Sequence, residues 1–206
     1  MKTLVIHPED RTTDDLKLVY EGIEAEIIRN TSDADFLYNK IKEADRVILL
    51  GHGTPSGLIG TGFRLCIDSR HVELLREQKN NVYIWCYAGS FLREHKLTGF
   101  ASGMFISEPM EASMLNVEAT EKELVDSNQL FASAVGESLV LSQNLEEMAE
   151  NALDKYVGSA PVIAYNRPLF ASYRDGIPTM NEEIYEGTEQ LPQFSVAEPF
   201  EYSLAY

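Results

Sequence analysis

Residues 45–53 read DRVILLGHG, and residues 81–89 read NVYIWCYAG. Each stretch begins with a short run of aliphatic, β-branched and aromatic residues, which is typical of a buried strand in a parallel sheet. Each run then ends at small, flexible residues. In an open α/β sheet, reactive groups gather at the carboxyl ends of the strands. We therefore expect His52 and Cys86 to reach the same pocket from two strands of one sheet.

A histidine and a cysteine at one sheet edge are the pair that a cysteine nucleophile needs. The thiolate is the attacking species, and a neighbouring imidazole lowers the pKa of the thiol and later protonates the leaving group. Gly51 and Gly53 allow an unusual turn and a close approach of substrate. The backbone N–H groups of Gly53 and Cys86 are candidate donors to the oxyanion of an acyl transfer. The pattern predicts Cys86 as nucleophile and His52 as general base and acid.

The motifs GHG at 51–53 and CYAG at 86–89 resemble those of the caspase-like cysteine peptidases, the group that includes gingipains, clostripain, legumain and separase. The resemblance extends over the organisation of residues 1–110. It implies a three-layer α/β sandwich with a mostly parallel central sheet. It also implies a cysteine endopeptidase that acts on a peptide or protein substrate.

Several members of this family cleave after Arg or Lys and use an acidic pocket. Glu108 and Glu111 follow the apolar run 103–107, which predicts a strand, and Asp68 lies beyond a glycine-rich loop. A desolvated carboxylate pairs well with a basic side chain and discriminates against neutral ones. These three acidic residues are therefore candidates for substrate binding. The alternative is that they are acids in the first turns of helices.

Strand and helix patterns alternate along the first half of the chain, which predicts right-handed βαβ units and helices on both faces of the sheet. The expected strands are the short apolar runs at residues 3–7, 23–28, 46–50, 82–86, 103–107 and 161–165. We expect one domain over residues 1–206. Within it, the prolines and scattered aromatic residues of 166–206 predict an irregular C-terminal extension.

Two other kinds of protein fit these patterns. One is a catalytically inactive interaction module with the caspase-like fold, and the other is a flavodoxin-like nucleotide-binding protein in which GHGTPSG (51–57) is a ligand loop. The glycines of 57–62 lack the Lys-Ser/Thr of a phosphate loop. A zinc site needs ligands that local spacing brings together, and the chain has no CxxC or HxxxH for its Cys66, His71, Cys86 and His52. We expect no metal and no cofactor.

The chain is acidic, with 33 Asp and Glu against 17 Lys and Arg and a formal charge of −16. This charge opposes binding to nucleic acid or to an anionic membrane surface. No run approaches the roughly 20 apolar residues of a membrane span, and the first apolar run is too short for a signal peptide. Two cysteines make a disulfide framework improbable and favour a cytoplasmic location. The sequence leaves the oligomeric state open.

Overall fold

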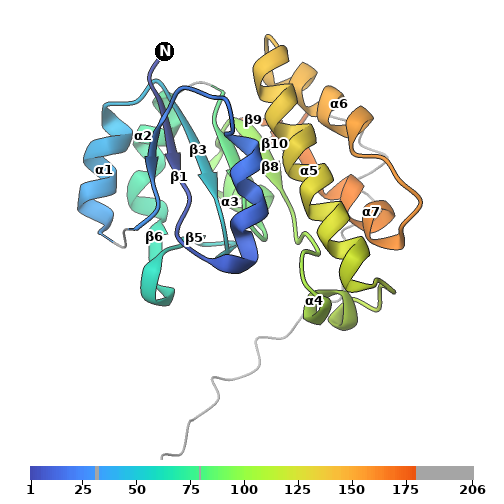
Figure 1. The fold of residues 1–206 in the computed structure, drawn as a ribbon. Helices are drawn as coiled ribbons and strands as arrows, with labels where there is room; N and C mark the ends of the chain where they lie inside the picture. The colour runs from blue at the N-terminus through green and yellow to red at the C-terminus, as the bar shows by residue number, and fades with distance from the viewer. Residues whose placement is uncertain (31–32, 79, 180–206) are drawn as a thin grey trace, which may run out of the picture.

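The computed structural model describes residues 1–30, 33–78 and 80–179, and its centre is a mixed sheet flanked by helices (Figure 1). The strand order is β10-β9-β8-β7-β3-β1-β2. Five strands run parallel: β1 (Thr3–Ile6), β2 (Glu26–Ile28), β3 (Arg46–Leu50), β7 (Val82–Ile84) and β8 (Gly99–Ser102). At one edge, β9 (Phe170–Arg174) runs antiparallel to both β8 and β10 (Ile177–Pro178). The sheet is therefore mostly parallel, as expected.

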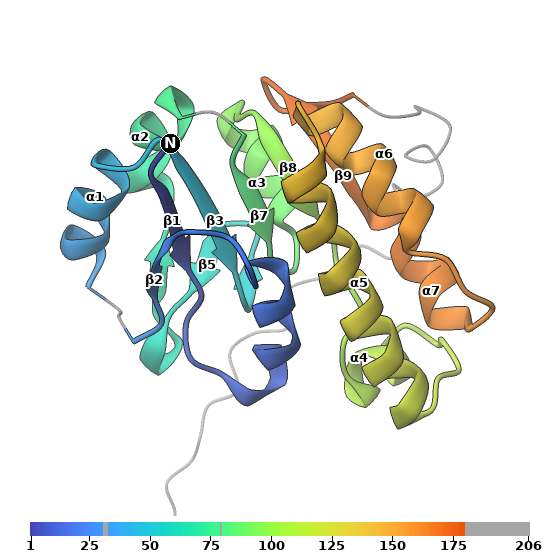
Figure 2. The same cartoon turned by 45° about the horizontal axis from the view of Figure 1, so that its top comes forward.

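The sheet buries both of its faces, because successive side chains of a strand point to opposite sides. In β3, Val47 and Leu49 join one core cluster, whereas Ile48 and Leu50 join the other. The first cluster is covered by α1 (Ala34–Lys42), α2 (Val72–Glu77) and α3 (Ala88–His95). The second is covered by η1 (Arg11–Val19), α5 (Glu121–Leu141), α6 (Leu145–Lys155) and α7 (Pro161–Asn166). Figure 2 shows these two helical layers on either side of the strands.

The part of the chain between β3 and α2 forms a second, small sheet. It consists of β4 (Gly53–Thr54), β5 (Gly57–Ile59) and β6 (Leu65–Ile67), which are antiparallel in that order. Three short 3-10 turns, η2 (Thr61–Phe63), η3 (Ser69–His71) and η4 (Arg167–Leu169), and the helix α4 (Pro109–Met114) complete the described elements. Among the described helices, none is long and apolar enough to cross a membrane.

Two of the expected strands are wrong. Residues 103–107 form a loop, and the strand of that region is β8, which lies just before them. β8 begins at Gly99, which packs tightly against Tyr83: a Cβ at Gly99 would lie 2.4 Å from the Tyr83 ring. Ile106 of the loop is buried, and its N–H donates to Asn166 Oδ1 at 2.7 Å. Residues 161–165 belong to α7, which begins with Pro161 in its first turn. A short apolar run does not by itself distinguish a strand from a buried loop or helix.

The expected irregular extension at 166–206 is wrong for its first part. Residues 170–173 pair with β8, and Phe170, Ala171 and Tyr173 are buried. β10 then covers β9 as a two-residue edge strand that contains Pro178, a residue suited to a sheet edge. Residues 180–206 lie outside the described part of the chain.

Candidate functional site

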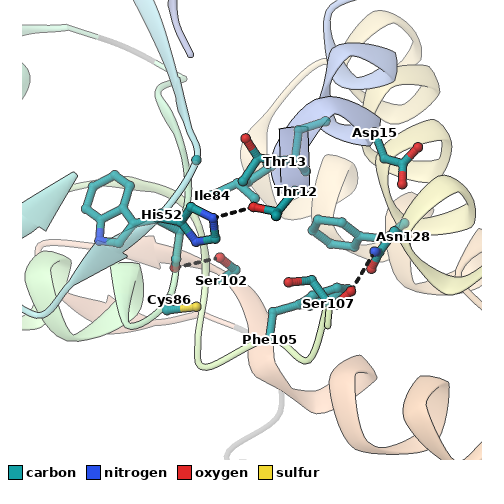
Figure 3. Close-up of a pocket in the computed structure, with 14 residues that line it drawn as sticks. Thr12, Thr13, Asp15, His52, Ile84, Cys86, Ser102, Phe105, Ser107 and Asn128 are labelled. Atoms are coloured by element: carbon teal, nitrogen blue, oxygen red, sulfur yellow. Dashed lines mark hydrogen bonds between the residues drawn. The ribbon is translucent and has the colours of Figure 1, made fainter. Parts of the chain in front are cut away.

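A small pocket lies at the carboxyl ends of the parallel strands (Figure 3). Its cavity volume is about 50 Å³. His52 and Cys86 both line it, as do Thr12 and Asp15 of η1 and Asn128 of α5. The structure therefore brings the predicted histidine and cysteine to one pocket.

The register of the sheet explains why His52 and Cys86 meet. Strands β3 and β7 are parallel neighbours, and Leu50 pairs with Ile84. His52 and Cys86 each follow this pair by two residues, so both leave the sheet at the same level. Gly51 lies between β3 and His52, and its φ of 139° favours glycine.

The His52 imidazole is half-buried and is held from the segment that follows β1. Its Nε2 lies 2.7 Å from Thr12 Oγ1 and 4.0 Å from Asp10 Oδ2. The Thr12 hydroxyl donates to Asp10 Oδ1 at 2.7 Å, and the Thr12 N–H donates to the same oxygen at 2.9 Å. Both bonds lower the pKa of the Asp10 carboxyl, the hydroxyl most strongly. No third member of a catalytic triad is evident from the sequence alone, where a backbone carbonyl is the candidate to orient His52.

Cys86 lies two residues after the end of β7 and precedes Tyr87, the N-cap residue of α3, which has a left-handed backbone (φ 69°). Burial raises the pKa of the Cys86 thiol to about 12, and the charges of Glu111 and Glu108 act in the same direction. The expectation of a lowered thiol pKa is therefore wrong for this structure. Cys86 is a neutral thiol at pH 7.

Gly53, the predicted partner of Cys86 in oxyanion binding, serves the packing of β4. A Cβ at Gly53 would lie 2.1 Å from Trp85 Cδ1 and 2.8 Å from the Gly57 carbonyl oxygen. Trp85 is buried, and its indole N–H donates to the Thr54 carbonyl at 3.0 Å. This glycine is required by its neighbours, and the oxyanion role of the Gly53 and Cys86 N–H groups stays a prediction.

The three predicted substrate-binding acids do not line the pocket and have other partners. Glu111 Oε2 accepts hydrogen bonds from the Ser107 N–H at 2.7 Å and from the Glu108 N–H at 3.1 Å, at the start of α4. Asp68 caps η3 and forms a bidentate ion pair with Arg70, whose Nη2 lies 2.7 Å from Asp68 Oδ2. These contacts favour the alternative interpretation of first-turn acids.

Several polar side chains that line the pocket are not candidate site residues in the sequence, and two of them are Asp15 and Asn128. Asp15 of η1 carries a carboxylate, and the sequence alone indicates an acidic residue in the first turn of a helix. Asn128 donates to the Ser107 carbonyl at 2.9 Å, and its Oδ1 is buried without a partner among the described residues. No Lys or Arg lines the described pocket. The Asp15 carboxylate and Asn128 Oδ1 are therefore hydrogen-bond acceptors, and the described lining offers neither of them a Lys or Arg partner.

The residues weighed as zinc ligands are engaged separately. Cys66 is fully buried, its thiol lies 3.6 Å from the Leu58 carbonyl oxygen, and burial raises its pKa to about 12. The buried His71 ring contacts the Asp68 N–H and the Ala34 carbonyl. Within the described residues, no three His, Cys, Asp or Glu side chains are grouped as metal ligands.

No family model matches the chain, and no curated protein matches it. One similar solved structure is a flavone reductase. The two chains are 18% identical, with a TM-score of 0.35, and the match covers 68% of this chain. It spans 64% of the flavone reductase, less than two thirds of that protein's length. A similarity at this level carries no conclusion about function.

Proposed function

We propose that the chain is a caspase-like cysteine peptidase with Cys86 as nucleophile and His52 as general base and acid. The observation that carries the proposal is that both side chains line one pocket, two residues beyond a paired position of adjacent parallel strands. A nucleophile and its base need this proximity before any other feature matters. The order of His before Cys along the chain agrees with the family resemblance of the GHG and CYAG motifs.

The chemistry is a thiol acyl transfer. The Cys86 sulfur attacks the carbonyl carbon of the scissile peptide bond while His52 accepts the thiol proton. His52 then gives this proton to the leaving amine as the C–N bond breaks, which leaves a thioester on Cys86. A water molecule, deprotonated by His52, hydrolyses the thioester and restores the thiol. Because the resting thiol is neutral, proton transfer accompanies the attack and does not precede it.

The pocket favours a substrate with a basic residue before the cleaved bond. Asp15 and the unpaired Asn128 Oδ1 offer acceptors, and no cation lines the described pocket. The formal charge of −16 attracts basic segments over a longer range. Asp15 and Asn128 therefore replace Glu108, Glu111 and Asp68 as the proposed specificity residues.

A catalytically inactive module on the same fold is the second candidate. The neutral Cys86 thiol and the cavity of about 50 Å³ favour it. Hydrolysis of a peptide separates this candidate from the peptidase.

The nucleotide-binding alternative has one supporting feature. The order β2-β1-β3-β7-β8 is that of a flavodoxin-like doubly wound sheet, in which the ligand lies at the carboxyl ends of the strands. Against it, the segment after β1 carries Glu9 and Asp10, and phosphate binding needs N–H groups and cations there. GHGTPSG forms β4 and its turn and does not open a helix.

A fluorogenic peptide library with Arg, Lys, Asp or Asn before the reporter tests the proposal. Wild type is compared with Cys86→Ala, with His52→Gln and with Cys66→Ala, which removes a thiol outside the pocket. We expect cleavage by wild type and Cys66→Ala, and a loss of about a thousandfold or more in kcat/KM for the other two variants. Turnover that survives Cys86→Ala overturns the assignment. Thermal stabilisation by FMN or ATP, without cleavage, favours nucleotide binding.

A further inference from the structure

Three side chains form a chain of hydrogen bonds at the rim of the pocket, from Asp10 through Thr12 to His52. Figure 3 shows its second link, between Thr12 and His52. Both links are 2.7 Å long. They join the segment after β1 to the segment after β3, which are forty residues apart in sequence. Neither Asp10 nor Thr12 belongs to the GHG or CYAG motifs.

The direction of each hydrogen bond follows from the donors available. An ionised carboxylate only accepts hydrogen bonds, so the Thr12 hydroxyl gives its single proton to Asp10. The lowered pKa of Asp10 agrees with this ionised form. With its proton used, Thr12 Oγ1 can only accept from His52, and the proton of that bond belongs to Nε2. Nδ1 of a neutral His52 then carries the lone pair, and it has no hydrogen-bond partner among the described residues.

We propose that Asp10 and Thr12 are positioning residues that hold His52 with its proton on Nε2, so that Nδ1 is the atom that exchanges protons with Cys86. Only the role of Nδ1 as base rests on the proposed function. The state of the ring is a property of the folded protein with or without activity.

The same contacts suit both states of the ring during catalysis. When Nδ1 takes the thiol proton, Nε2 keeps its own proton and its bond to Thr12. The imidazolium then lies with Nε2 4.0 Å from Asp10 Oδ2, close enough for the carboxylate to stabilise the new charge. No rearrangement of the ring is needed between the two states, which is the advantage of a preorganised base.

The segment that carries Thr12 is itself fixed by a buried network. His7, directly after β1, is fully buried, and its Nε2 lies 3.2 Å from the Thr13 hydroxyl. Arg29 lies with Nη1 3.1 Å from His7 Nδ1. Because arginine only donates, His7 Nδ1 accepts and its Nε2 donates to Thr13. Thr12 is thus held beside a residue whose own position is fixed by packing.

The test uses Thr12→Val, which keeps the shape and removes the hydroxyl, and Thr12→Ser, which keeps the hydroxyl. Thr61→Val, on the exposed turn η2, is the matched control. Thr12 is exposed, so we expect all three variants to fold. The first readout is the ring N–H signal of His52 in ¹⁵N-histidine-labelled full-length protein at a pH where the ring is neutral, assigned by its loss in His52→Gln. The second readout is kcat and KM on the best peptide of the library.

We expect an exchange-protected N–H on Nε2 in wild type and Thr61→Val, its loss in Thr12→Val and its return in Thr12→Ser. We expect kcat to fall about tenfold or more in Thr12→Val, with KM changed by less than about twofold, and to recover in Thr12→Ser. A proton on Nδ1, or a ring signal that Thr12→Val leaves unchanged, overturns the inference. If no variant cleaves any peptide but the ring signal behaves as described, the proposed peptidase fails and the positioning of His52 stands.

Discussion

Replacing Gly53 with alanine tests how the structure around the pocket is packed. A Cβ at this position would lie 2.1 Å from Trp85 Cδ1 and 2.4 Å from Trp85 Cγ, and real Cβ atoms essentially never approach so closely. These are ring atoms near the root of the side chain, and the Gly57 carbonyl oxygen at 2.8 Å closes the other side. Either the indole or the β4–β5 turn must therefore move.

The cost can be estimated from these contacts. Forcing an extra carbon into a packed site costs about 1–3 kcal/mol. If the indole rotates, its N–H also loses the bond to the Thr54 carbonyl, which contributes about 0.5–1.5 kcal/mol. We expect Gly53→Ala to lower the free energy of unfolding by about 2–4 kcal/mol. Because Trp85 directly precedes Cys86, we also expect slower peptide cleavage.

Urea unfolding followed by tryptophan fluorescence measures this loss at the right place, because Trp85 is the only tryptophan of the chain. Gly158→Ala is the control. Its Cβ would lie 2.5 Å from Ile163 Cδ1, the free end of a flexible side chain that can turn away, so its cost should stay below about 1 kcal/mol. Equal stabilities of Gly53→Ala and wild type, with an unchanged emission spectrum, refute the reasoning.

Three further predictions concern charge and protonation. Burial, with Arg29 nearby, lowers the pKa of His7 from 6.5 to about 4. The free energy of unfolding should therefore fall by up to about 3 kcal/mol as the pH drops from 6.5 to 4. A His7→Phe variant whose free energy of unfolding in urea falls equally steeply with pH contradicts this. Asp15→Asn should lower kcat/KM for Arg peptides about tenfold. Glu111→Ala should lower the free energy of unfolding by about 1 kcal/mol and keep the preference for Arg peptides. If Glu111→Ala loses that preference and Asp15→Asn keeps it, Glu111 is the specificity residue. Iodoacetamide labelling of Cys86 should be slow at pH 7 and rise steadily up to pH 10, because its thiol pKa is about 12, and a plateau below pH 8 contradicts this.

The sequence predicts best the features that depend on local patterns. The apolar runs at 46–50 and 82–86 contain the buried strands β3 and β7. Gly51 follows the end of β3, whereas β7 ends at Ile84, two residues earlier than expected. Since a parallel sheet aligns its carboxyl ends, the meeting of His52 and Cys86 in one pocket follows from these two runs alone. That part of the site is predictable without any knowledge of the rest of the chain.

The features that depend on distant contacts are not predictable in this way. Gly99 and the rest of β8 look less like a strand than residues 103–107, and they form one because the missing side chain lets Tyr83 pack closely. Thr12 reads as a residue of a helix start, and only the turn after β1 brings its hydroxyl to His52. The pKa of Cys86 depends on its burial, which no local pattern reveals.

Covalent capture of the nucleophile tests the peptidase assignment most directly. The full-length protein is incubated at pH 7 with a peptidyl acyloxymethyl ketone that ends in arginine, and the intact mass and the modified residue are determined. A bound peptide brings the electrophile to the thiol while His52 accepts its proton, so the raised resting pKa does not prevent the reaction. We expect one adduct per chain, on Cys86, formed at least about tenfold more slowly in His52→Gln. No adduct on the native protein, or an adduct whose rate is unchanged in His52→Gln, contradicts the assignment.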